Sequence, residues 1–316
     1  MAAWIAAATS YSTNNFPLVP FYIFYSMFGF QRVGDLAWAA GDIQARGFLI
    51  GGTAGRTTLN GEGLQHQDGH SHILAQTIPS CRAYDPSYGY EMAVVVQRGI
   101  KEMFEDNQNV FYYLTIENEN YEQPPMPKTK GIEDSIIKGM YLLESVETKG
   151  KKKTPRVQLM GSGSILNEVR EAAKILKESF DVESDIWSLT SVNELTREGQ
   201  AVDRWNLLHP EAKPKRSYVS EQLDGAEGPV VIATDYMKNY AEQLRKYIAN
   251  PMTVLGTDGF GRSDSRANLR QHFEVDQKYI VVAALFELAN CGDIERSVVT
   301  EAIKRFDIDT KKINPL

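Results

Sequence analysis

Residues 157–257 contain six segments that decide the fold: VQLMG (157–161), ILNEVREAAKILKESF (165–180), SDIWSLT (184–190), PVVIATD (229–235), MKNYAEQLRKYI (237–248) and MTVLGT (252–257). Four are short runs rich in apolar and β-branched residues, which is typical of buried strands. The other two have the apolar spacing of amphipathic helices. Strands that alternate with helices predict a largely parallel sheet flanked by helices, and therefore an α/β fold.

The first 116 residues show the same alternation. Trp4, Ile5 and Ala8 lie on one side of a first predicted helix. Further strands and helices are predicted in the order FYIFYSM (21–27, strand), RVGDLAWAAGDIQA (32–45, helix), FLIGGT (48–53, strand), CRAYDP (81–86, strand), YGYEMAVVVQRGIKEMFED (88–106, helix) and NVFYYLTI (109–116, strand). The tail after residue 263 is predicted to be mostly helical.

A domain linker is predicted at ENENYEQPPMPKTKG (117–131), because three prolines and many polar residues interrupt every period. We place the boundary near residue 126, which gives domains 1–126 and 127–316. GMYLLESVE (139–147) and RVQLMGSG (156–163) are predicted strands. The basic run between them, TKGKKKTP (148–155), is interpreted as a solvated hairpin tip, with a localisation signal as the alternative.

Composition excludes several classes of protein. The net charge is -7 and charged residues make up 24% of the chain, so no basic field exists to attract nucleic acid or an anionic membrane. Cys81 and Cys291 are the two cysteines, and they provide neither a disulfide framework nor zinc-knuckle spacing. The amino terminus lacks the basic start of a signal peptide. These features predict a protein of the reducing cytoplasm, outside the membrane.

A polar segment without any period, AGRTTLNGEGLQHQDGHSHI (54–73), is the richest in chemistry. It places His66, His70 and His72 within seven residues, beside Glu62 and Asp68. Histidines in a glycine-spaced loop suit proton transfer near neutral pH. Their spacing also allows a zinc site, and they could instead satisfy backbone groups. Spacing leaves acid–base, metal and structural roles open.

The aromatic run FYIFYSMFGF (21–30) has two interpretations. Aromatic residues are common in cores, and the pattern alone favours that role. As a functional alternative, Tyr25 and Phe28 lie where a strand ends beside a glycine, and could present ring faces to a flat heterocycle at the carboxyl edge of a sheet.

Two further glycine-rich stretches have weaker signals. GSGS (161–164) lies between a strand and a helix, but the third glycine of a dinucleotide motif is replaced by Leu166, so we favour a packing turn over nucleotide binding. In DGFGRSDSR (258–266), Ser263, Asp264 or Ser265 is expected to cap the next helix, although a nearby arginine pair could hold an anion.

Four strings together resemble a known family: STNN (12–15), FYIFYSMFGFQRVGDLAWAAGD (21–42), FLIGGTAGRTTLNGEGLQHQDGHSH (48–72) and VLGTDGFGRSDSR (254–266). They are similar to the homodimeric pyruvate dehydrogenase components of bacterial pyruvate dehydrogenase complexes, which belong to the transketolase-like thiamine diphosphate superfamily. The resemblance extends over essentially the whole chain. The string GRTTLNGEGLQHQDGHSH is specific, since transketolases and heterotetrameric dehydrogenases share the fold without it.

The resemblance implies a pyrimidine-binding domain followed by a transketolase C-terminal-like domain. It implies that Tyr25 and Phe28 stack on the aminopyrimidine of thiamine diphosphate, and that His66 is catalytic and faces the substrate. Glu62 belongs to the same loop and is a second catalytic candidate. Family members decarboxylate pyruvate and acetylate the lipoyl group of dihydrolipoyl acetyltransferase.

The resemblance also implies what lies elsewhere. In the family, a preceding diphosphate domain supplies the magnesium ligands, and a glutamate just before the first helix activates the pyrimidine ring. We find neither here, so no metal ligand is predicted in this chain. We expect a carboxyl-terminal part of a homodimeric enzyme, inactive when isolated. A zinc-dependent hydrolase using His66, His70 and His72 and a noncatalytic subunit-interaction protein are the competing hypotheses.

Overall fold

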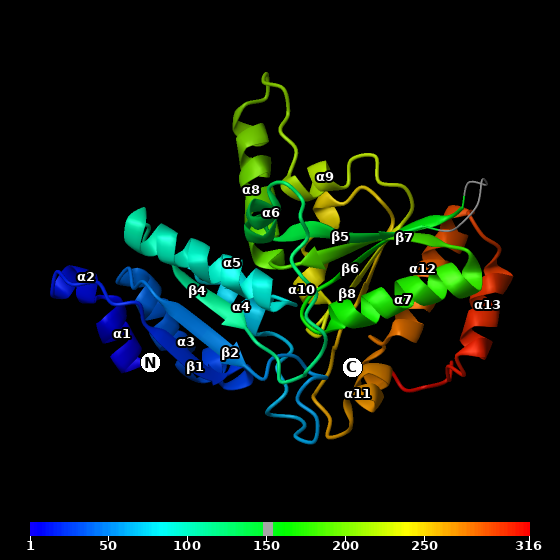
Figure 1. Cartoon of the computed structure of the whole chain (residues 1–316), viewed down its shortest axis with the longest axis horizontal. Helices are drawn as coiled ribbons and strands as arrows, with labels where there is room; N and C mark the ends of the chain where they lie inside the picture. Colours follow the sequence, from blue (N-terminus) through cyan, green and yellow to red (C-terminus); the bar gives the residue numbers. More distant parts are fainter. Residues whose placement is uncertain (148–153) are drawn as a thin grey trace.

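The structure is a computed structural model that describes residues 1–147 and 154–316. It contains two sheets flanked by helices, one in the amino-terminal part and one in the carboxyl-terminal part (Figure 1). The predicted α/β class is therefore confirmed.

The first sheet consists of four parallel strands in the order β1-β2-β4-β3. They are β1 (Phe21–Tyr25), β2 (Phe48–Gly52), β3 (Cys81–Tyr84) and β4 (Phe111–Thr115). All four were predicted from the sequence. Strands β2 and β4 are central, and nearly all their side chains are buried, whereas those of the edge strand β1 alternate between exposed and half-buried. The aromatic run is thus only partly core: Phe30 is buried, but Phe21 and Tyr25 are about half exposed.

Helices cover both faces of this sheet (Figure 1). One face packs against α1 (Ala2–Ala8), α3 (Gly29–Asp42) and α4 (Ser71–Gln76), while α5 (Gly89–Ile100), the π turn η2 (Lys101–Glu105) and α6 (Ile132–Lys138) cover the other. Trp4 shows how the first helix is fixed: its ring is buried, and its indole N–H donates to the Phe48 carbonyl at 3.1 Å. Two short pieces complete this part, α2 (Ser10–Thr13) and the 3-10 turn η1 (Ser26–Phe28).

The second sheet has five strands in the order β5-β7-β6-β8-β9. They are β5 (Met140–Val146), β6 (Arg156–Gly161), β7 (Glu183–Leu189), β8 (Val230–Ala233) and β9 (Met252–Leu255). All neighbours are parallel except β5 and β7. Strand β7 lies between β5 and β6, so these two strands do not pair as the predicted hairpin with a tip at 148–155 would require. Residues 148–153 themselves lie outside the described part of the chain.

Helices also cover both faces of the second sheet, in two apolar cores. One face carries α7 (Ile165–Phe180), α11 (Arg266–Phe273), α12 (Gln277–Cys291) and α13 (Arg296–Arg305), and the other carries α8 (Val192–Leu208), α9 (Tyr218–Gln222) and α10 (Asn239–Glu242). The helical tail is confirmed, whereas α8 and α9 had no counterpart in the sequence prediction. Gly199 inside α8 obscures its pattern, yet the Tyr247 ring packs directly on this glycine.

One predicted helix was too long. Residues 237–248 form only α10 and a 3-10 turn, η3 (Arg245–Tyr247). Their backbone bonds, such as Tyr247 N–H to the Leu244 carbonyl at 2.8 Å, close three-residue turns. This tighter winding keeps Tyr240 and Leu244 buried against the sheet.

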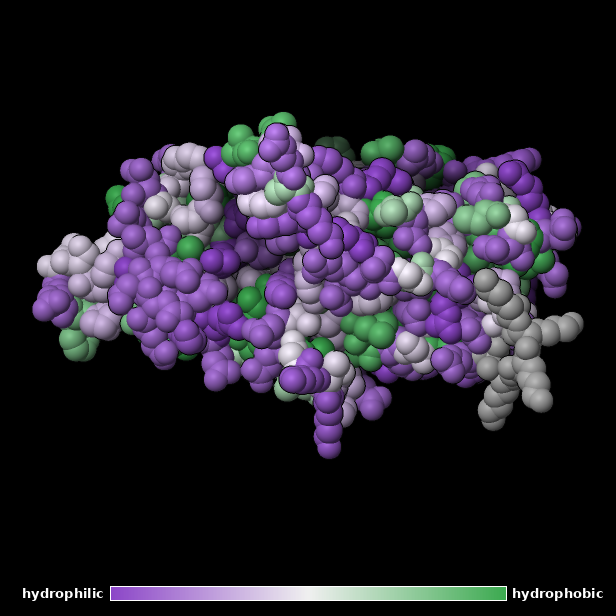
Figure 2. All heavy atoms as spheres, turned by 90° about the horizontal axis from the view of Figure 1, so that it is seen from above, coloured by the Kyte–Doolittle hydropathy of each residue, from purple (hydrophilic) through white to green (hydrophobic). Residues whose placement is uncertain are grey.

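No regular helix or strand occurs between residues 116 and 131 among the described residues, as expected of a linker. The domain boundary near residue 126 stays a prediction. Seen from above, the surface is mainly hydrophilic, with small separate hydrophobic areas (Figure 2). Within residues 1–147 and 154–316, no helix is both long enough and apolar enough to cross a bilayer.

Candidate active site

The carboxyl ends of the first sheet and of the second sheet's parallel strands face each other across the molecule. Asp85, which follows β3, donates its backbone N–H to the Thr190 carbonyl after β7 at 2.8 Å. From the other side, the Tyr236 hydroxyl after β8 donates to Asp85 at 3.0 Å. Ligands of α/β folds bind at such edges, so a functional site is expected here.

Four residues predicted from the sequence come together at this edge. The Tyr25 and Phe28 rings meet edge to face, with centroids 6.0 Å apart. The His66 ring meets Phe28 in the same way at 5.1 Å. Glu62 lies one turn before His66, with its carboxylate 3.6 Å from His66 Nε2. The structure therefore places a half-exposed and a half-buried aromatic ring beside an imidazole–carboxylate pair.

Phe28 is also covered by a cation. The Arg32 guanidinium of α3 lies 4.2 Å from the centroid of the Phe28 ring. Tyr25, by contrast, keeps about half of its surface exposed. A flat ligand would therefore find its open ring on Tyr25, with Phe28 held in place by Arg32 and His66.

The loop between β2 and α4, residues 53–70, has buried ends and an exposed middle. Residues 54–59 and 67–69 are buried, while most of residues 60–66 are accessible. Glu62 and His66 belong to the exposed middle, where they can reach solvent or a ligand. The loop is thus anchored at both ends and offers an acid–base pair between them.

Asp68 and His70 have other contacts. The Asp68 carboxylate accepts the backbone N–H groups of His70 and Ser71 at 3.0 and 2.9 Å, and also the Ser71 hydroxyl. These bonds satisfy donors at the start of α4, so Asp68 is a structural cap. His70 contacts the Gln31 amide of α3.

His72 is separate from this site. It is fully buried, hydrogen-bonds Thr115 Oγ1 at 3.0 Å and stacks against Tyr240. Burial lowers the pKa of its imidazole, which favours the neutral ring. Of the three histidines, His72 has the structural role. Within residues 1–147 and 154–316, no group of three His, Cys, Asp or Glu could hold a metal ion, which leaves the zinc-hydrolase hypothesis without a supporting group.

The GSGS turn is filled by the protein itself. Ser162 and Ser164 are buried, and Gly163 has a positive φ of 53°. A Cβ on Gly163 would collide with the Glu117 carboxylate, which reaches the turn from the segment after β4. The anion position at this helix start is thus taken by Glu117, in agreement with a packing turn.

Sequence reasoning missed the buried carboxylates between the two sheets. Asp85, Glu117 and Asp235 each lie one or two residues after the end of a strand, and that position is the signal that could have revealed them. Burial, together with the charge of Asp85, raises the pKa of Glu117 well above its ordinary value. Burial raises the pKa of Asp235 to about 7, although Arg270 opposes this shift.

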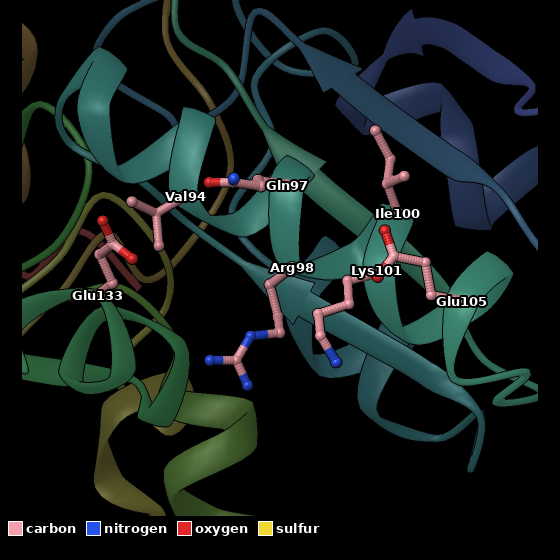
Figure 3. Close-up of a pocket in the computed structure, with 7 residues that line it drawn as sticks. All are labelled: Val94, Gln97, Arg98, Ile100, Lys101, Glu105 and Glu133. Atoms are coloured by element: carbon pink, nitrogen blue, oxygen red, sulfur yellow. The ribbon is translucent and has the colours of Figure 1, made fainter.

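A separate cavity of about 570 Å³ lies between α5 and α6 (Figure 3). Arg98 and Lys101 line it from α5 and the π turn, and Glu133 lines it from α6. Both cations are engaged: Arg98 with Asp134 at 2.6 Å and Lys101 with Asp106 at 2.7 Å. This cavity contains no residue of the His66 site.

Both parts of the chain match known protein families. Residues 1–124 match the pyruvate dehydrogenase E1 component middle domain, and residues 139–276 match the transketolase-like C-terminal domain. The pyruvate dehydrogenase E1 component of Pseudomonas aeruginosa is 63% identical over 317 residues, which covers 100% of this chain. That of Escherichia coli K12 is 60% identical over 316 residues and covers 99%. The chain spans 35% of the length of both relatives.

Solved structures show the same fold at low identity. Transketolase from Leishmania mexicana is 16% identical, with a TM-score of 0.61 over 86% of this chain and 34% of the transketolase. A split-gene transketolase, described as an inactive beta4 tetramer, is 15% identical, with a TM-score of 0.61 over 91% of this chain and 81% of its own. With both family models and relatives of 60% identity or more in agreement, the chain belongs to the family of pyruvate dehydrogenase E1 components.

Proposed function

We propose that this region supplies the aminopyrimidine side and the substrate-facing acid–base pair of a thiamine diphosphate-dependent pyruvate dehydrogenase. The proposal rests on one observation: Tyr25, Phe28, His66 and Glu62 meet at the carboxyl edge of the first sheet. The names of the relatives support the proposed reaction class, and this geometry supports the choice of residues. Tyr25 and Phe28 are its proposed cofactor-binding residues, and His66 and Glu62 its proposed catalytic residues.

The residues present fit the pyrimidine half of the cofactor. Tyr25 offers an open ring at a strand end, and Gly52, its partner at the end of β2, has no side chain that would crowd a flat heterocycle. When bound, thiamine diphosphate supplies an electron sink for loss of carbon dioxide from a 2-oxo acid. His66 would donate or accept the proton at the substrate oxygen through Nδ1, the ring nitrogen that Glu62 leaves free, and Glu62, whose carboxylate lies 3.6 Å from Nε2, would orient that imidazole.

Magnesium and the diphosphate group are proposed to be held by residues of the E1 component outside this region. The described residues contain no group of three potential metal ligands, and the α7 start is filled by Glu117. We also propose that the complete enzyme is a cytoplasmic homodimer that passes its acetyl group to dihydrolipoyl acetyltransferase, as the resemblance implies.

The proposal is tested by His66→Gln in a complete E1 component that carries this region. We expect pyruvate decarboxylation to fall by about 10²- to 10⁴-fold, because an acid–base group is lost. His209→Gln is the matched control, since His209 is exposed and stacks on Trp205 outside the site. Equal activity of the His66 variant and the control would refute the assigned role.

A second experiment uses residues 1–316 alone. Purified polypeptide with thiamine diphosphate, magnesium and pyruvate is expected to release no carbon dioxide, because the diphosphate and magnesium sites are proposed to lie outside this region. Release above the cofactor-only background would contradict the division of the site proposed here. Size-exclusion measurement on the same sample tests the competing hypothesis, self-association without any affinity for the cofactor.

A further inference from the structure

The segment DGFGRSDSR (258–266) contacts the loop that carries Glu62 and His66, although some 200 residues separate them in sequence. Gly63 N–H donates to the Ser263 hydroxyl at 2.9 Å. Gly61 N–H donates to the Asp264 carbonyl at 3.2 Å. The Arg266 guanidinium donates to the Thr58 carbonyl at 2.8 Å. Three points of the loop are therefore tied to one segment of the other domain.

Gln67, the neighbour of His66, provides the tightest of these connections. Its side chain is fully buried and uses both ends of its amide. Nε2 donates to the carbonyls of Leu59 and Arg262 at 2.7 and 2.8 Å, and Oε1 accepts the Arg262 N–H at 2.8 Å. Each bond to a buried amide constrains its orientation, since a lost partner leaves a polar group unsatisfied.

Two glycines allow the loop and the segment to approach so closely. A Cβ on Gly63 would lie 2.7 Å from the carbonyl carbon of Arg262, and a Cβ on Gly261 would lie 2.8 Å from Leu64 N and 2.6 Å from Gln67 Oε1. No side chain fits at either position without moving backbone or the buried Gln67 amide. The close packing at these two glycines is thus a second observation, independent of the hydrogen bonds, that the loop and the segment fit each other.

A second connection holds the entry of the loop. The Asp235 carboxylate accepts the Thr57 N–H at 3.1 Å, and its backbone carbonyl accepts the Arg56 N–H at 3.2 Å. The exit is held by the Asp68 cap described above. The exposed residues 60–66 therefore lie between fixed ends, and the turn closed by His66 N–H and the Gly63 carbonyl at 3.2 Å carries the imidazole.

We propose that Gln67 and Ser263 are positioning residues that set the orientation of His66 for the reaction. This inference rests on the proposed function, because the orientation of His66 matters for the reaction only if His66 is catalytic. Neither residue needs to touch the substrate. They act by fixing the backbone on both sides of the imidazole, as a precise catalytic geometry requires.

Gln67→Glu tests the proposal with almost no change of volume. The carboxylate can still accept the Arg262 N–H, but it faces the Leu59 and Arg262 carbonyls without a donor. We expect amide hydrogen exchange of residues 59–66 in the 1–316 chain to increase by at least about tenfold, with α7 unchanged. In the complete enzyme we expect kcat to fall by about tenfold or more and KM for pyruvate to stay within about threefold. The matched control is Gln271→Glu, an exposed glutamine of α11.

Two milder substitutions at Ser263 separate the expected effect from simple unfolding. Ser263→Ala removes only the acceptor of the Gly63 N–H, and is expected to raise exchange at that amide and to lower kcat, while Ser263→Thr keeps the hydroxyl and restores both. Unchanged exchange in both loop variants, or faster exchange with kcat equal to that of Gln271→Glu, would overturn the proposal. Hydrogen exchange can be measured without turnover. A wild-type enzyme inactive on pyruvate would therefore refute the proposed function, while the exchange data would still test whether Gln67 and Ser263 fix the loop.

Discussion

Two glycine-rich turns of this molecule both follow a strand, but one exposes its functional side chains and the other is buried. The histidine loop follows β2, and the GSGS turn follows β6, a central strand of its own sheet. The first exposes Glu62 and His66, whereas the second is buried and filled by Glu117. Both are held by the opposite domain, so what differs is which part of the turn the opposite domain covers. The composition of a turn does not decide its chemistry; the surface facing it does.

The largest loss of stability on substitution is expected at Arg270, which connects Glu119 in the segment after β4 to the helix that follows the buried turn. Its guanidinium pairs with Glu119 and with Glu168 of α7, the latter at 2.9 Å. Arg270→Met should cost about 3 kcal/mol of unfolding free energy, because two largely buried carboxylates lose their partner. Urea denaturation measures this. Arg216→Met, which breaks the exposed pair with Asp224, is the control and should cost less than about 1 kcal/mol.

Gly163→Ala breaks the buried turn itself. The residue has φ 53°, and its new methyl group would collide with the Glu117 carboxylate. We expect a loss of about 2–3 kcal/mol, from backbone strain and overpacking together. Gly34→Ala in α3 is the matched control, since nothing lies within 4 Å of its Cβ position. A Gly163 variant as stable as this control would show that the turn is looser than its contacts indicate.

How much of this contrast can be predicted from sequence depends on distance along the chain. Strand β2 was predicted from its local pattern, and Glu62 and His66 became candidates through their clustering in the loop and the family resemblance. The contact between Gln67 and Arg262 joins positions 195 residues apart, and no local period reports it. The same is true of Glu117 at Gly163, where the sequence shows a turn but not its neighbour. Helix α8 was missed for a related reason, because Gly199 is explained only by the distant Tyr247 ring.

The buried carboxylate Asp235 should also make the stability of the protein depend on pH. With its pKa raised to about 7, Asp235 holds a proton in the folded protein over a range in which the unfolded chain has lost it. Stability therefore falls as pH rises from about 4 towards 7, by at most about 1.4 kcal/mol per pH unit for this group. Asp235→Asn should make the stability–pH curve flatter in that window. Glu211→Gln, at an exposed site, should leave the curve unchanged.

The smallest effect on stability is expected at the exposed pair. Glu62 and His66 are about half and one third exposed, and the Glu62 carboxylate lies 3.6 Å from His66 Nε2, an exposed contact worth between 0 and about 1 kcal/mol in water. Glu62→Gln should therefore leave the urea midpoint of the 1–316 chain nearly unchanged, while it lowers kcat in the complete enzyme by removing the group proposed to orient His66. If Glu62→Gln destabilised the chain as strongly as Gly163→Ala, both turns would be structural supports, and the proposed division between an open turn and a filled one would be wrong.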